Sequence, residues 1–307
     1  MSTTENSTDH TTDIPSNSNG KTKDPSDNVA VSKGERTVSV ASHLVLSLWT
    51  VIVVLPLVWV FLSSWKTTSE IFQSPLSLPK EWSFDNYVRA WTDSNIGDYM
   101  LNSVIVVTSA LVIVMVLGSA AAYSLARYPF PGSGIVYYLI LAGLTFPVFL
   151  AIVPLFFVLK NTGLLNTLPG LIATYVAFAF PFTVFFLFPF FRALPQEIAE
   201  AAELDGAGEW RTFFQVMLPM ARPGIVAISI FNFLGLWNQF LLPVALNTNE
   251  ENYVLSQGMA RFASQAGYAV DFGQLFAAVV ITIVPVLVVY IVSQRQLQGS
   301  LSQGTLK

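Results

Sequence analysis

Six long apolar stretches constrain the fold of this 307-residue chain more than any other feature of its sequence. They occupy residues 43–63, 101–124, 135–158, 169–191, 224–246 and 274–293. Each is long enough to cross a hydrocarbon core of roughly 30 Å as a helix, which rises about 1.5 Å per residue. Because 53% of the residues are hydrophobic and only 11% are charged, the composition is typical of a multi-pass membrane protein. We therefore predict an all-α membrane protein with six transmembrane helices.

Prolines interrupt five of these six stretches. A proline has no backbone N–H to donate, but a helical bundle tolerates it where neighbouring helices or waters satisfy the freed carbonyl. We expect kinks at Pro56, Pro147, Pro154, Pro181, Pro189, Pro243 and Pro285.

The distribution of Lys and Arg predicts the orientation of the spans. If the N-terminus is inside, ten of the 15 basic residues lie in inner segments and five lie in outer loops. Because positive charge favours the cytoplasmic side, this distribution predicts that both termini lie inside, in an N-in/C-in arrangement. The same orientation places residues 195–219 on the cytoplasmic side.

A charged segment separates the fourth and fifth spans. From Glu200 to Pro219 it reads EAAELDGAGEWRTFFQVMLP. Pro195 suits a first helical turn, residues 196–204 are good helix formers, and the Asp-Gly-Ala-Gly sequence at 205–208 stops that helix. We expect two short helices joined by a tight turn. The small Ala201 and Ala202 would allow the backbone of a partner to approach, so the segment is a candidate docking surface.

This segment resembles the EAA loop of ABC importer permeases, and its Asp-Gly-Ala form is similar to the carbohydrate-uptake branch related to the maltose permeases. The residues that carry the resemblance, and to which it implies an ATPase-coupling role, are Glu200, Ala201, Ala202, Asp205, Gly206, Ala207 and Pro219. We call residues 195–219 the coupling loop. The alternative is an ordinary cytosolic linker helix that ends in a glycine turn.

The resemblance implies a type I ABC importer permease fold and the smaller sugar-permease subunit of a binding-protein-dependent importer in the cell membrane. The implied partners are a second, similar permease, an ATPase dimer, an extracytoplasmic solute-binding protein, membrane lipid and a sugar, with no nucleic acid. ATP and Mg would be used by the partner ATPase, and no cofactor is expected in this chain. A di- or oligosaccharide is the expected substrate, while an amino sugar or a glycerol phosphodiester stays open.

Residues 1–42 differ in composition from the rest of the chain. They are rich in Ser, Thr, Asn and Asp and contain almost no large apolar residue before Val29, so they cannot bury enough surface to offset the entropy of ordering. We predict a disordered cytoplasmic tail, followed by a transmembrane domain at 43–307. The segment from Pro15 to Thr22 ends in Gly-Lys-Thr, like a phosphate-binding loop. It lacks the leading glycine of such a loop, which argues against a nucleotide site.

The sequence offers no catalytic or metal-binding constellation. It has no cysteine, its two histidines His10 and His43 are isolated, and the predicted spans contain no ionisable residue beyond the bordering His43. Proton- or ion-driven carriers usually keep such groups at membrane depth, so the energy source is expected outside the bilayer. A passive solute channel and an intramembrane enzyme stay as alternatives.

Polar residues on the fifth span predict the substrate path. They recur at steps of three and four residues and so share one helical face: Ser229, Asn232, Gly235 and Gln239. Asn and Gln match the donors and acceptors of sugar hydroxyls. Trp237 to Phe240 also resembles the Trp-Asn-acidic-Phe segment of the family, with Gln239 in place of the carboxylate. Hydrogen bonding between helices is the commoner use of buried amides and is the favoured alternative.

Three further segments carry weaker predictions. In the outer loop 64–98, the helical spacing of Phe84, Tyr87, Val88 and Trp91 predicts a short amphipathic helix that is capped near Ser83 and lies along the membrane surface or on the bundle. Packing is the favoured role of this helix, and contact with a partner is the alternative. The outer loop 247–273 is a candidate surface for a substrate-delivering protein through Glu250, Glu251, Arg261 and Asp271. The polar segment 298–304 resembles the tail that maltose-type permeases send towards the ATPase interface, and an unattached end is the alternative.

Overall fold

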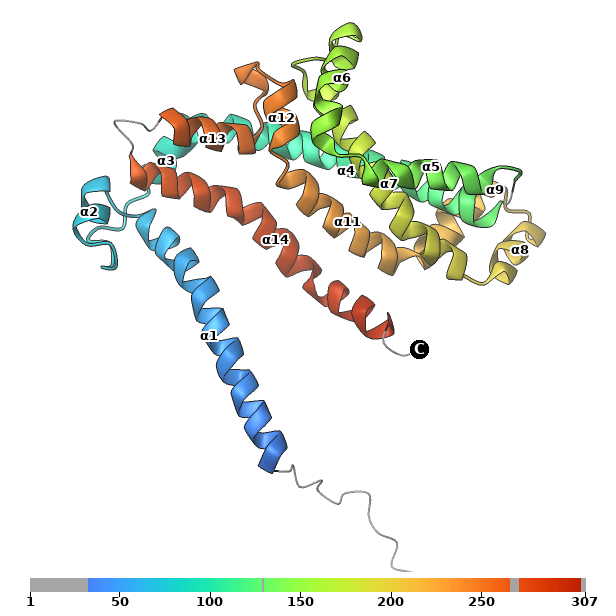
Figure 1. Ribbon diagram of the computed structural model, residues 1–307, viewed down its shortest axis with the longest axis horizontal. Coiled ribbons are helices and arrows are strands. Elements are labelled where there is room, and N and C mark those ends of the chain that lie inside the picture. The colour runs from blue at the N-terminus through green and yellow to red at the C-terminus, as the bar shows by residue number, and fades with distance from the viewer. Residues whose placement is uncertain (1–32, 129, 266–270, 305–307) are drawn as a thin grey trace, which may run out of the picture. The chain divides into compact units, whose positions relative to one another are not determined.

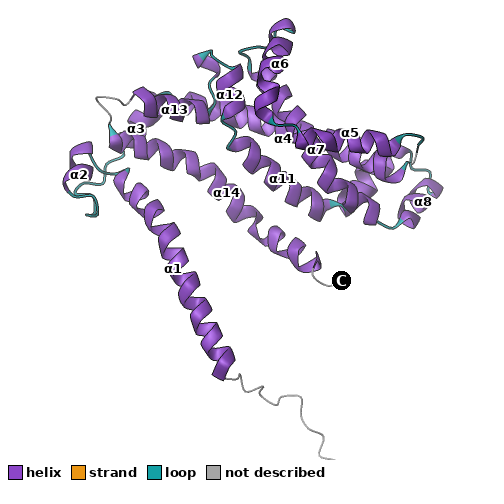
Figure 2. Ribbon diagram, in the orientation of Figure 1, coloured by secondary structure: helices purple, strands orange, loops and turns teal. Residues whose placement is uncertain are grey.

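The computed structural model describes residues 33–128, 130–265 and 271–304, and over these ranges the regular elements are all helical (Figure 2). The chain divides into two compact units, Met1–Val54 and Leu55–Lys307. The described part of the first unit belongs to α1 (Lys33–Ser63), which begins ten residues before the expected start of the first span at 43. The rest of the predicted tail, residues 1–32, lies outside the described residues.

All other elements belong to the second unit (Figure 1). In chain order they are α2 (Thr68–Gln73), α3 (Asp85–Thr92), α4 (Ile96–Arg127), α5 (Ser133–Thr145), α6 (Val148–Asn161), α7 (Leu168–Ala193), α8 (Gln196–Leu204), α9 (Glu209–Arg211), the π-helix η1 (Thr212–Met217), α10 (Leu218–Met220), α11 (Arg222–Trp237), α12 (Leu241–Leu246), the 3-10 helix η2 (Glu250–Asn252), α13 (Leu255–Gln265) and α14 (Phe272–Gly304).

Among the described residues, four helices are long and apolar enough to cross a membrane alone, and the number reaches six only if each of two bent pairs is one span. The first pair, α5 and α6, bends by 104°. The kink expected at Pro147 in the third apolar stretch, 135–158, is therefore present as a sharp bend between two helices. Pro147 explains the bend, because it cannot donate a backbone hydrogen bond and favours an extended Phe146, whose φ and ψ are −79° and 118°.

The expected fifth span, 224–246, is also broken. The helix α11 ends at Trp237, and α12 starts at Leu241. In a continuous helix, residue 243 would donate to the carbonyl of Gln239, but Pro243 has no N–H. The hydroxyl of Ser256 donates to this carbonyl instead, at 2.8 Å. The second bent pair, residues 209–220 with α11, turns by 79°.

The centre of the second unit is the pair α4 and α7. These helices approach closely at Gly118, where an added Cβ would lie 2.5 Å from the Cγ2 of Thr183. Small residues at such a contact are typical of membrane helix pairs. One apolar cluster surrounds the later half of the pair and includes Val114, Tyr123, Leu187, Phe191, Phe213 and Met217. This cluster brings the end of α4 next to the segment that follows α8.

The segment between α1 and α4 forms the predicted helix, α3, which is held by a polar contact. The hydroxyl of Ser83 accepts from the backbone N–H of Asp85 at 3.2 Å, as a cap near Ser83 requires. The apolar face is largely exposed in this chain (66% for Phe84), which favours the predicted placement along the membrane surface over packing on the bundle through that face. Asn86 is buried instead, because its side-chain amide donates to the carbonyls of Ser64 and Lys66, both at 2.9 Å.

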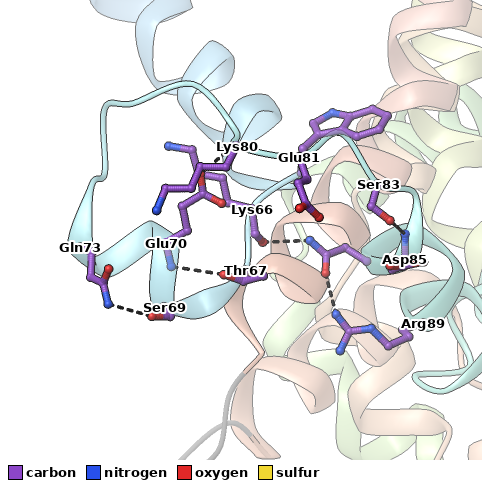
Figure 3. Close-up of a pocket in the computed structure, with 12 residues that line it drawn as sticks. Lys66, Thr67, Ser69, Glu70, Gln73, Lys80, Glu81, Ser83, Asp85 and Arg89 are labelled. Carbon is purple, nitrogen blue, oxygen red and sulfur yellow. Dashed lines mark hydrogen bonds between the residues drawn. The ribbon is translucent and has the colours of Figure 1, made fainter.

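The same segment is tied to the start of α14. The carboxylate of Asp271 accepts from Arg89 at 2.5 Å, from the hydroxyl of Thr68 at 3.2 Å and from the backbone N–H of Gln274 at 3.2 Å. Burial alone would raise the pKa of the Asp271 carboxyl, but these bonds outweigh it and hold the pKa below its usual range. Beside this junction, Figure 3 shows a pocket of about 330 Å³ lined by charged side chains of both signs.

Candidate functional site

The coupling loop has the local geometry that the sequence predicts. The helix α8 ends at Leu204, and Gly206 then adopts a φ of +80°. Three backbone bonds close the turn, from the N–H groups of Asp205, Gly206 and Ala207 to the carbonyls of Ala201, Glu203 and Ala202, at 2.9 to 3.0 Å. A left-handed glycine after a helix is a common C-terminal cap, because it costs a glycine little. A second short helix, α9, begins at Glu209, so the expected helix–turn–helix is confirmed.

This loop presents apolar side chains to the surroundings. Figure 1 shows α8 beside α9 at the far right of the picture, and every residue of α8 is at least partly exposed. Leu204 is 89% exposed and Trp210 is 72% exposed. Trp210 was not among the predicted coupling residues, although a tryptophan in a polar segment between two spans was a signal that could have found it. Exposed large side chains beside polar ones are typical of a protein interaction surface.

The predicted coupling residues are all at least partly exposed. Five of them are exposed and two are half-buried. The exposed residues are Glu200, Ala201, Asp205, Gly206 and Pro219, and the half-buried residues are Ala202 and Ala207. The segment then continues into the π-helix η1, whose Thr212, Phe213 and Met217 are buried. A π-helical turn is rare and is frequently found at functional sites.

A second candidate site is a cavity of about 320 Å³ beside α11. Three of the four predicted substrate-path residues, Asn232, Gly235 and Gln239, line it. Aromatic rings supply much of the remaining wall, from Phe146, Tyr175, Phe178, Phe182 and Phe231. The fourth predicted residue, Ser229, lies outside the lining, and its hydroxyl donates to the Ile225 carbonyl at 2.8 Å.

Asn232 also connects two helices. It is buried, and its side-chain amide donates to the hydroxyl of Thr183 on α7 at 2.9 Å. The interhelical hydrogen bond that the sequence left open is therefore present. Asn232 lines the cavity at the same time, so its position fits both interpretations.

The charged residues predicted in the loop 247–273 are mostly engaged within the chain. Glu250 forms an ion pair with Arg261 and accepts from the hydroxyl of Tyr99 at 3.2 Å. The hydrogen bond from Arg261 lowers the pKa of the Glu250 carboxyl. Asp271 is paired with Arg89, while residues 266–270 lie outside the described residues. A substrate-delivering partner would therefore meet three of the four predicted charges, Glu250, Arg261 and Asp271, already neutralised in pairs, while Glu251 has no ion pair among the described residues.

The polar C-terminal segment 298–304 is the last part of a helix. The helix α14 continues without a break to Gly304, beyond the predicted end of the last span at 293. Residues 305–307 lie outside the described range.

Comparison with known proteins identifies what this arrangement resembles. Residues 114–302 match the family model described as "Binding-protein-dependent transport system inner membrane component". The diacetylchitobiose uptake system permease protein NgcG of Streptomyces coelicolor is 64% identical over 278 residues, which cover 91% of this chain and 92% of that protein. The trehalose transport system permease protein SugB of Mycobacterium tuberculosis is 32% identical and covers 82% of this chain and 92% of its own length.

The fold has a counterpart among solved structures. A chain of a bacterial ABC transporter that imports the acidic polysaccharide alginate superposes with a TM-score of 0.76, at 20% identity, over 86% of this chain and 98% of that chain. The protein is a permease component of a transport system. The matched range includes α7, α11 and the whole coupling loop, and the chain belongs to the family of binding-protein-dependent transport system inner membrane components.

Proposed function

We infer that this chain is the transmembrane subunit of an ATP-driven sugar importer, in which a partner ATPase docks on the coupling loop. The observation that carries this proposal is the exposure of Leu204 and Trp210 beside the turn at Gly206. Two large apolar side chains in a polar loop favour a protein partner at that place. A passive channel would need no such surface, because its opening does not depend on a docked ATPase.

The proposed topology has six membrane crossings with both termini inside. It requires that α5 and α6 together form one crossing, and that the bent segment 209–237 forms another. The excess of Lys and Arg in the inner segments supports this orientation. It places α8 on the cytoplasmic side, where ATP is available, and the Arg89–Asp271 pair on the outer side.

The complete transporter would contain a second, similar permease, two copies of the ATPase and a solute-binding protein. ATP binding would close the ATPase pair, and each coupling loop would move with it and switch the two permeases from inward-facing to outward-facing. Hydrolysis would reset them. Nucleotide shifts the equilibrium because it binds the closed ATPase state more tightly, and the loop passes that preference to the bundle.

We propose N,N′-diacetylchitobiose, a disaccharide with two acetamido groups, as the substrate. The 64% identical relative is named for the uptake of this sugar. The cavity beside α11 supports the assignment chemically, because its aromatic rings suit the apolar faces of sugar rings. The amides of Asn232 and Gln239 match hydroxyl and acetamido groups as donors and acceptors.

The test is uptake by proteoliposomes that contain the assembled transporter, made with the ATPase, the second permease and the binding protein. Import of labelled diacetylchitobiose should require ATP inside and loaded binding protein outside. Cellobiose, which lacks the acetamido groups, is the matched control and should compete poorly. Uptake that proceeds without ATP would refute the proposal and favour a passive channel.

A further inference from the structure

We propose that Tyr123 and Arg127, in the last turns of α4, are positioning residues that carry the movement of α8 into the membrane bundle. The inference rests on the proposed function, because it concerns how a docked ATPase moves the coupling loop. It adds two residues that lie about 70 positions before the loop in the sequence and outside the resemblance described above.

Arg127 holds the start of the loop. Its guanidinium donates to the carbonyl of Leu194, which is the last residue before Pro195 and α8. Leu194 has left the helical conformation of α7, with a φ of −69° and a ψ of 143°, so its carbonyl points out of the helical ladder. A hydrogen bond from a charged donor is shorter and stronger than one between neutral groups. The entrance to α8 is therefore attached to the end of α4.

Tyr123 contacts the later part of the coupling loop. Phe213, the second residue of η1, is only 4% exposed, and its ring centroid lies 5.1 Å from that of Tyr123. The ring of Phe191 on α7 completes the cluster, at 5.5 Å from Tyr123 and 6.3 Å from Phe213. Aromatic pairs at these separations attract each other beyond the burial of their area. The segment after α9 is therefore packed onto α4 and α7 together.

Both attachments are on one face of one helix. Tyr123 and Arg127 are four residues apart, and such residues lie above one another on an α-helix. A load on α8 would therefore reach the same side of α4 from both ends of the loop. Farther along α4, Gly118 touches Thr183, whose hydroxyl accepts from the cavity residue Asn232. Contiguous contacts thus connect the coupling loop to the proposed sugar cavity.

The experiment uses the complete transporter in proteoliposomes and two matched pairs of variants. Arg127→Met removes the donor but keeps a long stem, and Arg127→Lys keeps a donor. Tyr123→Leu removes the ring, and Tyr123→Phe keeps it. The measured quantities are the number of ATP molecules hydrolysed per sugar imported and the amount of assembled complex.

Arg127→Met and Tyr123→Leu should raise the number of ATP molecules per sugar by about fivefold, the lower range of typical coupling between sites, in complexes that assemble normally. Arg127→Lys and Tyr123→Phe should stay close to the wild-type ratio. Either disruptive variant decides the question alone if the other does not assemble. The inference is wrong if an assembled disruptive variant keeps the wild-type number of ATP molecules per sugar. It is also wrong if both disruptive variants fail to assemble, because Tyr123 and Arg127 would then only hold the fold together. Wild-type complexes that import no sugar with ATP would instead refute the proposed function.

Discussion

Replacing Gly206 by valine should uncouple ATP hydrolysis from sugar import while the complex still assembles. The φ of Gly206 is +80°, in the left-handed region that disfavours residues with a Cβ. Among the described residues, nothing lies within 4 Å of the place where that Cβ would be, so the cost comes from the backbone alone. It amounts to roughly 1–2 kcal/mol, nearer the upper value for a β-branched side chain.

A cost of this size lowers the ratio of correctly turned to misturned coupling loops by about 5- to 30-fold. The appropriate assay is the stimulation of ATP hydrolysis by sugar-loaded binding protein, measured together with import in the same proteoliposomes. Gly206→Val should lose most of both, whereas Gly206→Asn should retain them because asparagine tolerates the left-handed conformation.

Gly208 provides the positional control in the same loop. It is exposed like Gly206, but its φ of −72° and ψ of 165° suit any residue, and among the described residues its Cβ would also meet open space. Gly208→Val should therefore couple normally. Equal behaviour of the two valine variants would refute the reasoning, because the left-handed turn would then have no part in coupling.

Three other outcomes are expected. Asn232→Leu should lower the stability of the purified complex by about 1 kcal/mol, because an interhelical hydrogen bond is lost. Gln239→Leu should lower sugar import at an unchanged melting temperature. The reverse pattern would contradict the roles assigned to the two amides. Asp271→Asn should lower the melting temperature near neutral pH, and the difference from the wild type should shrink as the pH falls below about 4. The reason is that the lowered pKa makes this carboxylate stabilising only while it is ionised. A difference in melting temperature that is independent of pH would refute that role. Deleting residues 298–307 should reduce sugar-stimulated ATP hydrolysis without reducing assembly, and unchanged stimulation would indicate an unattached end.

The helical class and the positions of most spans followed from the sequence because apolar length is a local property. Kinks at Pro147 and Pro243 were predicted, but the severity of the two interruptions did not follow from the sequence. A proline in an apolar stretch permits a gentle kink, a 104° bend or a complete break, and the outcome depends on which neighbour satisfies the freed carbonyl. For Gln239 that neighbour is Ser256, which belongs to a different element.

The packing of α3 shows the same limit in another form. Helical spacing of Phe84, Val88 and Trp91 predicted the existence of the helix but not the face that it buries. Two backbone carbonyls near the end of α1 accept from Asn86, and this polar contact decides the rotation of α3. A short helix beside a membrane has no need to bury its apolar face within its own chain, so the usual inference from spacing to packing fails there.

The coupling loop was predictable because its turn, its small residues and its glycine are all encoded within 25 residues, from 195 to 219. Its proposed anchors on α4 were not, since Tyr123 and Arg127 look like an ordinary aromatic residue and an ordinary basic residue at the end of a span. Only the fold shows that their neighbours are Phe213 and the carbonyl of Leu194.

Asn232 shows why a buried amide in a transport cavity need not have a single role. An asparagine side chain has four hydrogen-bonding positions. The amide of Asn232 donates to the hydroxyl of Thr183 at 2.9 Å and to the sulfur of Met115 at 3.5 Å, which leaves the two acceptor positions of its side-chain oxygen. A sugar hydroxyl that enters the cavity beside α11 could donate to this oxygen without breaking the contact between α7 and α11. Because Thr183 also touches Gly118 on α4, the group that would sense the sugar is one contact away from the helix that holds the coupling loop. Substrate contact and helix association are thus compatible roles at this residue, and a substitution of Asn232 changes both at once. Gln239 is half-buried on the same cavity wall, so Gln239→Leu tests the sugar contact more directly.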